Sequence, residues 1–134
     1  MCKNFAQSLY IVSRIQYLGK MKYLEPNKKI SCDDIIQCIF DLNKLDIDVY
    51  NELKKIKESR AQILAKKLNR ERSTVYRSLQ KLTYSKICTK KTNKIASGGH
   101  YYSYVINDTK EIKQNLEKCV EEWYKKMKNT IKEL

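Results

Sequence analysis

Glycine, proline and histidine are scarce in this sequence of 134 residues, and long apolar runs are missing. Three Gly and one Pro, with 42% hydrophobic residues, are typical of a packed domain rather than a disordered or collagen-like chain. No apolar stretch approaches the roughly 20 residues that a membrane-spanning helix needs. Ser13, Arg14 and Gln16 interrupt the N-terminal stretch, so no signal peptide is expected. We therefore expect one modest core, no membrane contact and a cytoplasmic location.

Patterns for metal binding and catalysis are also missing. The five Cys residues have irregular spacing without a CxxC pair, and His100 is the only histidine, so no structural zinc site is expected. Paired carboxylates, a Cys-His arrangement and a phosphate-binding glycine loop are all absent from the sequence, which argues against an enzyme. We expect no cofactor, no catalytic residues, and thiols that are mostly reduced and partly buried. A redox-sensing role for one thiol stays open.

The positive charge is concentrated in one part of the chain. The sequence carries 28 Lys and Arg against 15 Asp and Glu. Residues 59–106 hold 11 of the basic residues and a single acid, Glu71, whereas both flanking segments mix the two signs. A solvated surface usually mixes signs. The one-signed segment therefore favours a polyanionic partner, with a basic solvated surface as the simpler alternative.

Apolar residues recur at helical spacing through the middle of the chain. The pattern predicts a short helix after an N-cap at Ser31, a longer helix after Asn43 and a third helix after Ser59. A tight connection at 69–71 then leads into a fourth helix. Residues 4–24 fit either a helix or a strand.

After the fourth helix the period of the apolar pattern changes to two. Residues 87–90 and 101–106 alternate like strands on either side of a polar turn that ends in two glycines, which predicts a β-hairpin. Within the second strand, Tyr102 and Tyr104 share one face, which we assign to the core. Tyr101 points to the other face and is expected to be exposed.

A long helix is expected to follow a cap at 107–109, and it carries an extended apolar seam. A domain this small cannot cover the whole seam, so pairing with the same helix of a second chain is expected. Folding back onto the N-terminal segment is the alternative. The expected dimer contacts are Ile112, Leu116, Cys119, Trp123, Met127 and Ile131.

Helix, helix, tight turn, helix and hairpin is the order of a winged helix-turn-helix, a mostly α fold with a small β-hairpin (α+β). In such folds the last of the three helices enters the major groove of DNA, and the hairpin, or wing, suits the minor groove or the flanking phosphates. The expected domains are an N-terminal extension (1–30), a DNA-binding domain (31–106) and a C-terminal dimerisation helix (107–134). The expected DNA-binding residues are Arg72, Ser73, Thr74, Tyr76, Arg77, Gln80 and Lys81 on the helix and Lys90, Lys91, Lys94 and His100 on the wing.

The stretch LAKKLNRERSTVYRSLQKL, from Leu64 to Leu82, resembles the helix-turn-helix signature of archaeal MarR/TrmB-like winged-helix regulators. Residues 31–49 and the Gly-Gly-aromatic wing before a long helix are similar to the Lrs14-like subgroup. The resemblance covers about residues 28–134. It implies DNA-binding regulators that dimerise through their terminal helices, often repressors and sometimes abundant, weakly specific binders. The sequence departs from the pattern in the turn, where Arg70 replaces an apolar residue, and at Lys86, where a Gly usually ends the recognition helix.

Together these patterns predict a homodimeric transcriptional regulator that reads duplex DNA, a repressor by resemblance, with no membrane partner and no small-molecule effector that can be inferred. Two other functions stay open: a weakly specific architectural or nucleoid protein, and a protein-interaction module inside a transcription complex. The fourth helix could also have an ordinary solvated outer face, and Arg77 could brace the wing instead of contacting DNA. The tyrosines of the hairpin could stack on single-stranded bases.

Overall fold

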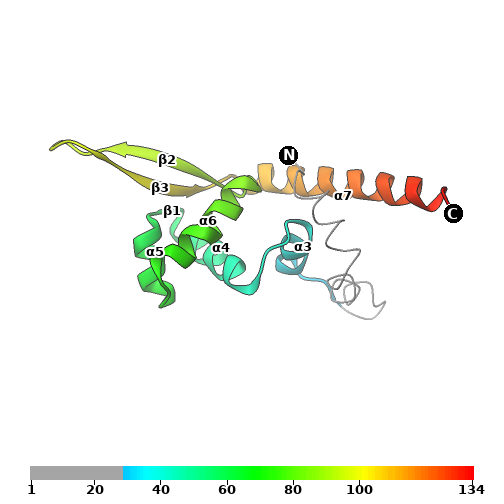
Figure 1. The fold of residues 1–134 in the computed structure, drawn as a ribbon, viewed down its shortest axis with the longest axis horizontal. Coiled ribbons are helices and arrows are strands. Elements are labelled where there is room, and N and C mark those ends of the chain that lie inside the picture. The colour runs from blue at the N-terminus through cyan, green and yellow to red at the C-terminus, as the bar shows by residue number, and fades with distance from the viewer. Residues whose placement is uncertain (1–28) are drawn as a thin grey trace. The chain divides into compact units, whose positions relative to one another are not determined.

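The computed structural model describes residues 29–134, which form five helices and a three-stranded antiparallel sheet (Figure 1). The helix or strand expected over 4–24 lies outside the described residues. The chain divides into two compact units, which are described one at a time. One unit is formed by residues 43–112, and the described part of the other by 29–42 and 113–134.

Three helices pack around one core in the unit of residues 43–112. They are α4 (Lys44–Ile56), α5 (Ala61–Leu68) and α6 (Arg72–Tyr84) (Figure 1). The apolar side chains at their centre with no exposed area are Val49, Leu53, Leu64, Val75, Leu79 and Leu82. Burial of one such side chain contributes roughly 1.5–3 kcal/mol, so this cluster holds α6 firmly against the other two helices.

The two helix N-caps expected at the start of the described chain are both present as capping boxes. Asn43 accepts a hydrogen bond from the Asp46 backbone N–H at 2.9 Å, and the Asp46 carboxylate accepts one from the Asn43 backbone N–H at 2.9 Å. Ser31 and Asp34 make the same exchange at the start of the short helix α3 (Cys32–Ile39). Each box satisfies two backbone donors that a helix start leaves without partners.

The sheet contains one strand that the sequence pattern does not predict. Strands β2 (Cys88–Lys94) and β3 (His100–Ile106) form the expected hairpin, and both extend further toward the turn than expected. Strand β1 (Glu58–Ser59) pairs with the other side of β3, which gives the order β1-β3-β2. The N-cap expected at Ser59 is wrong, because Ser59 belongs to this strand and Arg60 precedes α5 without a side-chain cap.

The alternation of side chains along β3 predicted the burial of its tyrosines only in part. Tyr104 is buried, with 2% of its surface exposed, but Tyr102 on the same face is 44% exposed, so its assignment to the core is wrong. The hairpin extends beyond the helices of its unit (Figure 1), and in the ladder Tyr102 lies nearer the turn than Tyr104. Tyr101 is half-buried rather than exposed, because the Arg60 guanidinium lies 3.5 Å from the centre of its ring.

Helix α6 ends without the usual glycine. The N–H of Ile87 donates to the carbonyl of Leu82 at 2.9 Å, and the N–H of Lys86 donates to the carbonyl of Thr83 at 3.1 Å, which is the hydrogen-bond pattern of a Schellman motif. Lys86 has φ +59°, in the left-handed region that residues with a Cβ disfavour. The helix end is therefore a point of local backbone strain.

Helices α3 (Cys32–Ile39) and α7 (Thr109–Ile131) complete the described chain. The expected cap of α7 is confirmed, because the Asp108 carboxylate accepts a hydrogen bond from the Lys110 backbone N–H at 3.2 Å. Cys119 is disulfide-bonded and is an exception to the expectation of mostly reduced thiols. The other cysteines among the described residues, Cys32, Cys38 and Cys88, form no disulfide.

Helix α7 carries two adjacent apolar stripes instead of one seam. In the first stripe Ile112 and Cys119 are buried within the single chain, and Leu116 and Trp123 are half-buried. The second, which we call the outer stripe, has side chains that are 39–59% exposed and ends in the fully exposed last residue of the chain. It consists of Val120, Tyr124, Met127, Ile131 and Leu134. The six expected dimer contacts are thus divided, and only Met127 and Ile131 lie on the outer stripe.

Candidate nucleic-acid interface

The expected tight connection between α5 and α6 is present. Asn69 has φ +51°, in the left-handed region that Asn tolerates better than most residues. The N–H of Arg70 donates to the carbonyl of Ala65 at 2.9 Å, so this helix end also has a Schellman bond. Arg70, in place of an apolar residue, is therefore accommodated in the turn, and α6 begins two residues later.

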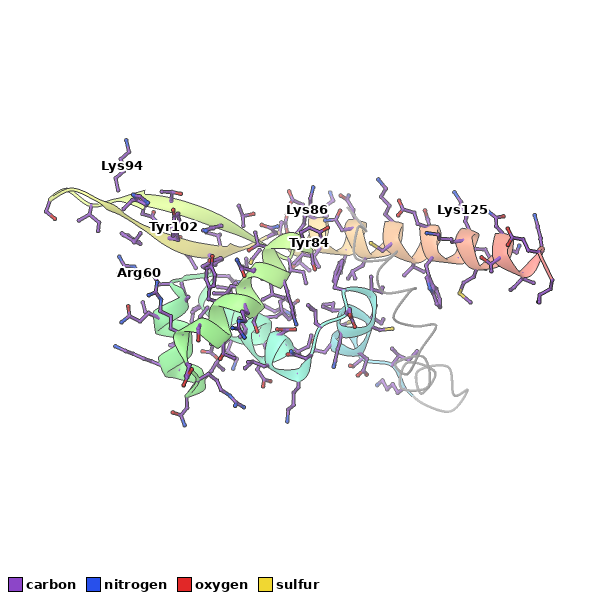
Figure 2. All side chains as sticks on the ribbon, viewed as in Figure 1. Arg60, Tyr84, Lys86, Lys94, Tyr102 and Lys125 are labelled. Atoms are coloured by element: carbon purple, nitrogen blue, oxygen red, sulfur yellow. The ribbon has the colours of Figure 1, made fainter. Side chains whose placement is uncertain are left out.

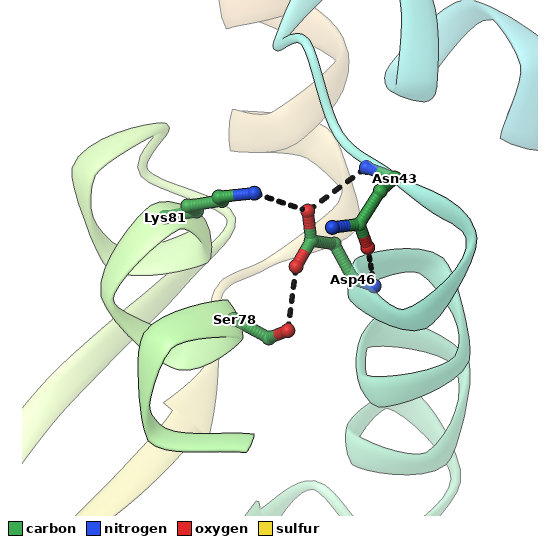
Figure 3. Close-up of polar contacts among 4 residues, drawn as sticks. All are labelled: Asn43, Asp46, Ser78 and Lys81. Carbon is green, nitrogen blue, oxygen red and sulfur yellow. Dashed lines mark hydrogen bonds and ion pairs between the residues drawn. The ribbon is translucent and has the colours of Figure 1, made fainter. Parts of the chain in front are cut away.

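A buried carboxylate ties α6 to α4 (Figure 3). Asp46 is 1% exposed, and one of its oxygens accepts a hydrogen bond from the Ser78 hydroxyl at 2.5 Å. The other oxygen accepts the capping bond from Asn43 and lies 3.0 Å from the Lys81 ammonium. The sequence pattern predicted the start of α4 at Asn43 but assigned no role to Asp46 or Ser78. No local signal could have paired them, because they are 32 residues apart.

The outer face of α6 is its exposed side, opposite the core. It is formed by Arg72, Ser73, Tyr76, Arg77 and Gln80. Two residues of this helix that were expected to contact DNA are less accessible to it. Thr74 is half-buried, and the ammonium of Lys81 is paired with Asp46. Among the described residues, no carboxylate forms an ion pair with Arg72 or Arg77, so both guanidinium charges are available to a ligand.

The wing has two chemically different faces, because side chains alternate along each strand. Lys90 lies opposite Tyr104 and Lys94 lies opposite His100 in the ladder. These residues share a face with Cys88, which is buried beside Thr83 of α6. We call this the inner wing face, because its base packs against α6. It brings three of the expected wing residues, Lys90, Lys94 and His100, to the same side.

Lys91 lies on the other face of the wing. Its ammonium is 3.7 Å from the Glu58 carboxylate, which also accepts a hydrogen bond from the buried Ser103 hydroxyl at 2.6 Å. Asn93 donates to the same hydroxyl at 2.8 Å. The geometry therefore ties Lys91 to β1 and separates it from the other expected wing residues. Glu58 was not singled out from the sequence, because its strand is too short to show a pattern.

One cation of the wing reaches back to α6. The Lys90 ammonium lies 4.0 Å from the centre of the Tyr102 ring and 5.9 Å from that of Tyr76 (Figure 2 labels Tyr102). The His100 ring meets Tyr102 edge-on at 5.4 Å. Ammonium groups are attracted to aromatic ring faces at such distances. The contacts link strand β2, strand β3 and helix α6 at one point.

Two titratable side chains behind this point are affected by burial. Burial raises the pKa of the Tyr104 phenol; nearby Tyr76 raises it further, and Arg72 opposes the shift. Burial also raises the pKa of the Cys88 thiol to about 11, against a weaker opposite effect of the hydrogen bond with Thr83. The thiol is therefore uncharged at neutral pH and packs as a small apolar side chain.

Two other kinds of feature, a metal site and a membrane-spanning helix, are not found among the described residues. Within residues 29–134, no cluster of three or more His, Cys, Asp or Glu side chains is arranged to hold a metal ion. Of the helices α3 to α7, none is long and apolar enough to cross a membrane. The cationic surface of α6 and the wing is the candidate binding site.

The fold and this surface define a winged helix-turn-helix protein, and comparisons with known proteins agree. The family model for the sugar-specific transcriptional regulator TrmB matches residues 36–109. An uncharacterised protein of Methanocaldococcus jannaschii, MJ1503, is 32% identical over 87% of this chain and 89% of its own length. A second uncharacterised protein of that organism, MJ1082, is 28% identical over 78% of this chain and 86% of its own length.

Solved structures share the fold. A possible transcriptional regulator from Methanosarcina mazei has a TM-score of 0.70 and 27% identity, covering 81% of this chain and 92% of that one. The ST1889 protein from the thermoacidophilic archaeon Sulfolobus tokodaii has a TM-score of 0.57 and 21% identity, covering 68% of this chain and 89% of that one. The chain belongs to the TrmB family of transcriptional regulators, which is not a class of enzymes. The expected family and fold class are confirmed.

Proposed function

We propose that the chain binds duplex DNA with α6 in the major groove and the wing along the adjacent backbone and minor groove. The observation that carries this proposal is the charge of one continuous surface, formed by the outer face of α6 and the inner wing face. It presents Arg72, Arg77, Lys90 and Lys94, and among the described residues no carboxylate forms an ion pair with any of them. Such a surface releases counterions when it meets phosphates, which provides affinity for any DNA sequence.

Base recognition would come from the polar side chains of the outer face. Arg77 can donate two hydrogen bonds to one guanine, and each good bidentate contact provides roughly 1–3 kcal/mol of discrimination. Gln80 and Ser73 offer an amide and a hydroxyl on the same side of the helix. The core and the buried Asp46 hold this helix in place, and a rigid helix is what precise base contacts require.

A salt-dependent titration with two duplexes tests this function. One duplex is selected for tight binding from a random pool, and the other is random. Arg77→Ala should weaken the selected duplex more than the random one. Lys54→Ala, which removes an exposed charge from α4, is the matched control and should change neither. Equal binding of both duplexes by the wild type would support the architectural alternative, and no binding at low salt would refute the proposal.

We also propose that two copies pair through the outer stripe of α7. Its residues follow each other at spacings of 4, 3, 4 and 3, which is the heptad pattern of a coiled coil. Exposed apolar side chains in such a row are costly in water, and a second copy covers all of them at once. Of the expected contacts, Met127 and Ile131 belong to this interface. Ile112 and Cys119 are buried within the chain and lie outside this interface.

The charges beside the stripe favour an antiparallel pair. Glu121 and Lys128 occupy equivalent flanking positions, so an antiparallel arrangement brings Glu121 opposite the partner's Lys128 twice. A parallel pair would instead place the two copies of Glu117 side by side in the seam. At 1.5 Å per residue, the antiparallel pair separates the two Ile112 residues by roughly 40 Å. Half-sites one turn apart on DNA are roughly 34–36 Å apart.

Light scattering tests the pairing by measuring the molecular mass of variants in solution. Met127→Lys should give monomers, whereas Lys125→Ala, which alters a neighbouring position outside the stripe, should leave the mass unchanged. Glu121→Lys should weaken an antiparallel dimer, and adding Lys128→Glu should restore it. Restoration would not occur in a parallel pair, and a monomeric wild type would refute the dimer.

The regulatory role follows from these two proposals. A dimer bound across a promoter excludes the transcription machinery, so repression is the expected effect, and it takes place in the cytoplasm. In this scheme residues 31–106 are the DNA-binding domain and residues 107–134 the dimerisation helix, with 1–30 as an N-terminal extension. Transcription in vitro from a template that carries the selected site should fall as protein is added. An increase would mean activation instead.

A further inference from the structure

We propose that Tyr76, Lys90 and Tyr102 form a clasp for one backbone phosphate, so that Tyr76 holds the DNA strand and does not read a base. The inference rests on the proposed function and assigns roles within that surface. It divides the outer face of α6 into two parts. Arg77 and Gln80 contact the bases, and Tyr76 contacts the DNA backbone beside the wing.

The clasp joins three elements. Tyr76 comes from α6, Lys90 from β2 and Tyr102 from β3, and the Lys90 ammonium lies 5.9 Å and 4.0 Å from the centres of the two rings. All three side chains are exposed, with Tyr76 at 36% and Tyr102 at 44%. The rings therefore restrict the ammonium without enclosing it, and its remaining side is open to a ligand. An ammonium restricted in this way loses less conformational freedom on binding than a free lysine would.

One hydroxyl group of the clasp, that of Tyr76, has a proton available to donate outward. The Tyr76 hydroxyl accepts a hydrogen bond from the Gln80 amide at 3.1 Å, so its own proton is free for another acceptor. The Tyr102 hydroxyl lies 3.3 Å from the His100 ring, with which it can exchange a hydrogen bond in either direction.

This set of groups fits a phosphate better than a base. The clasp combines phenol donors with positive charge, and no carboxylate is paired with Lys90 or Arg72 among the described residues. A base edge presents both donors and acceptors, whereas a phosphate presents acceptors only. Lys90 lies over one face of each ring, where it competes with base stacking on that face. In the proposed docking, the strand between the two grooves passes this junction of helix and wing.

Conservative variants separate a phosphate contact from a base contact. Tyr76→Phe and Tyr102→Phe keep the rings and remove only the hydroxyls. Each should weaken the selected and the random duplex alike by about tenfold, the effect of one hydrogen bond to a charged group, with the salt slope unchanged. Lys90→Met should weaken both duplexes and lower the salt slope by about one unit. The matched control is Tyr84→Phe, an exposed tyrosine on the same helix, which should leave both affinities unchanged (Figure 2).

The possible results distinguish the clasp from the function on which it rests. Wild-type protein that binds no duplex at low salt would refute DNA binding itself. Wild-type binding that is unaffected by Tyr76→Phe, Tyr102→Phe and Lys90→Met would refute the clasp alone. A loss limited to the selected duplex in Tyr76→Phe would make Tyr76 a base-reading residue and overturn the assignment. Tighter binding to single strands, lost in the same variants, would also overturn it. Thermal melting of each variant checks that the fold is intact.

Discussion

Removing the Asp46 carboxylate should be among the most destabilising single changes in the DNA-binding unit. Asp46→Ala deletes the acceptor of the capping bond from the Asn43 N–H and leaves the buried Ser78 hydroxyl without its partner. A lost cap costs about 1 kcal/mol, and a buried unsatisfied hydroxyl costs about 1–3 kcal/mol. The Lys81 side chain is 47% exposed, so its ion pair adds no more than about 1 kcal/mol. The expected loss is therefore about 2–5 kcal/mol.

A graded series of variants tests where this stability originates. Asp46→Asn keeps the shape and one acceptor and should cost about 1–2 kcal/mol, while Ser78→Ala should cost about 1 kcal/mol because Asp46 keeps its other partners. Lys81→Met should cost less than about 1 kcal/mol and leave the salt dependence of DNA binding unchanged, since that charge is already paired. Urea unfolding followed by circular dichroism provides the free energies.

Thermal melting provides an independent measure of the same series. For a chain of this size about 4 °C corresponds to 1 kcal/mol, so Asp46→Ala should lower the melting temperature by about 8–20 °C. The reasoning would be refuted if Asp46→Ala cost no more than Ser78→Ala, because the carboxylate would then not be the shared partner of both helices. It would also fail if Lys81→Met were the most damaging variant.

Three further predictions concern other parts of the same unit. Lys94→Ala should lower the salt slope of DNA binding by about one unit. Lys91→Ala should change the slope less, because Lys91 is paired with Glu58. Equal effects of the two variants would contradict the division of the wing into two faces. Lys86→Gly should stabilise the protein to urea by about 0.5–1 kcal/mol, because glycine adopts the left-handed conformation without strain, and Lys86→Ala should give no gain. Burial raises the pKa of the Cys88 thiol from 9.0 to about 11, so the thiol ionises at lower pH in the unfolded chain than in the folded one. The free energy of unfolding of the wild type, relative to that of Cys88→Ala, should therefore fall between about pH 9 and 11. A difference that stays constant with pH in urea unfolding would refute this.

Much of the candidate interface could be predicted because its signals are local. The helix that carries Tyr76 and Arg77 was placed by the spacing of its apolar residues, and the hairpin by the change of period. The concentration of positive charge in residues 59–106 is a property of composition and needs no structure. The roles of Lys81 and Lys91 could not be predicted, because their acidic partners, Asp46 and Glu58, lie more than 30 residues away in the chain.

By itself the sequence determined the helices of the described chain, the N-caps of two of them at Ser31 and Asn43, the two strands of the hairpin, and which part of the chain is cationic. These properties depend on residues within about one helical turn of each other. Only the tertiary structure decided which cations are neutralised, which face of the wing meets α6 and which stripe of α7 stays exposed. Those outcomes depend on side chains that folding brings together from distant positions in the chain. The alternation of a strand and the period of a helix show which residues share a face, but not what covers that face.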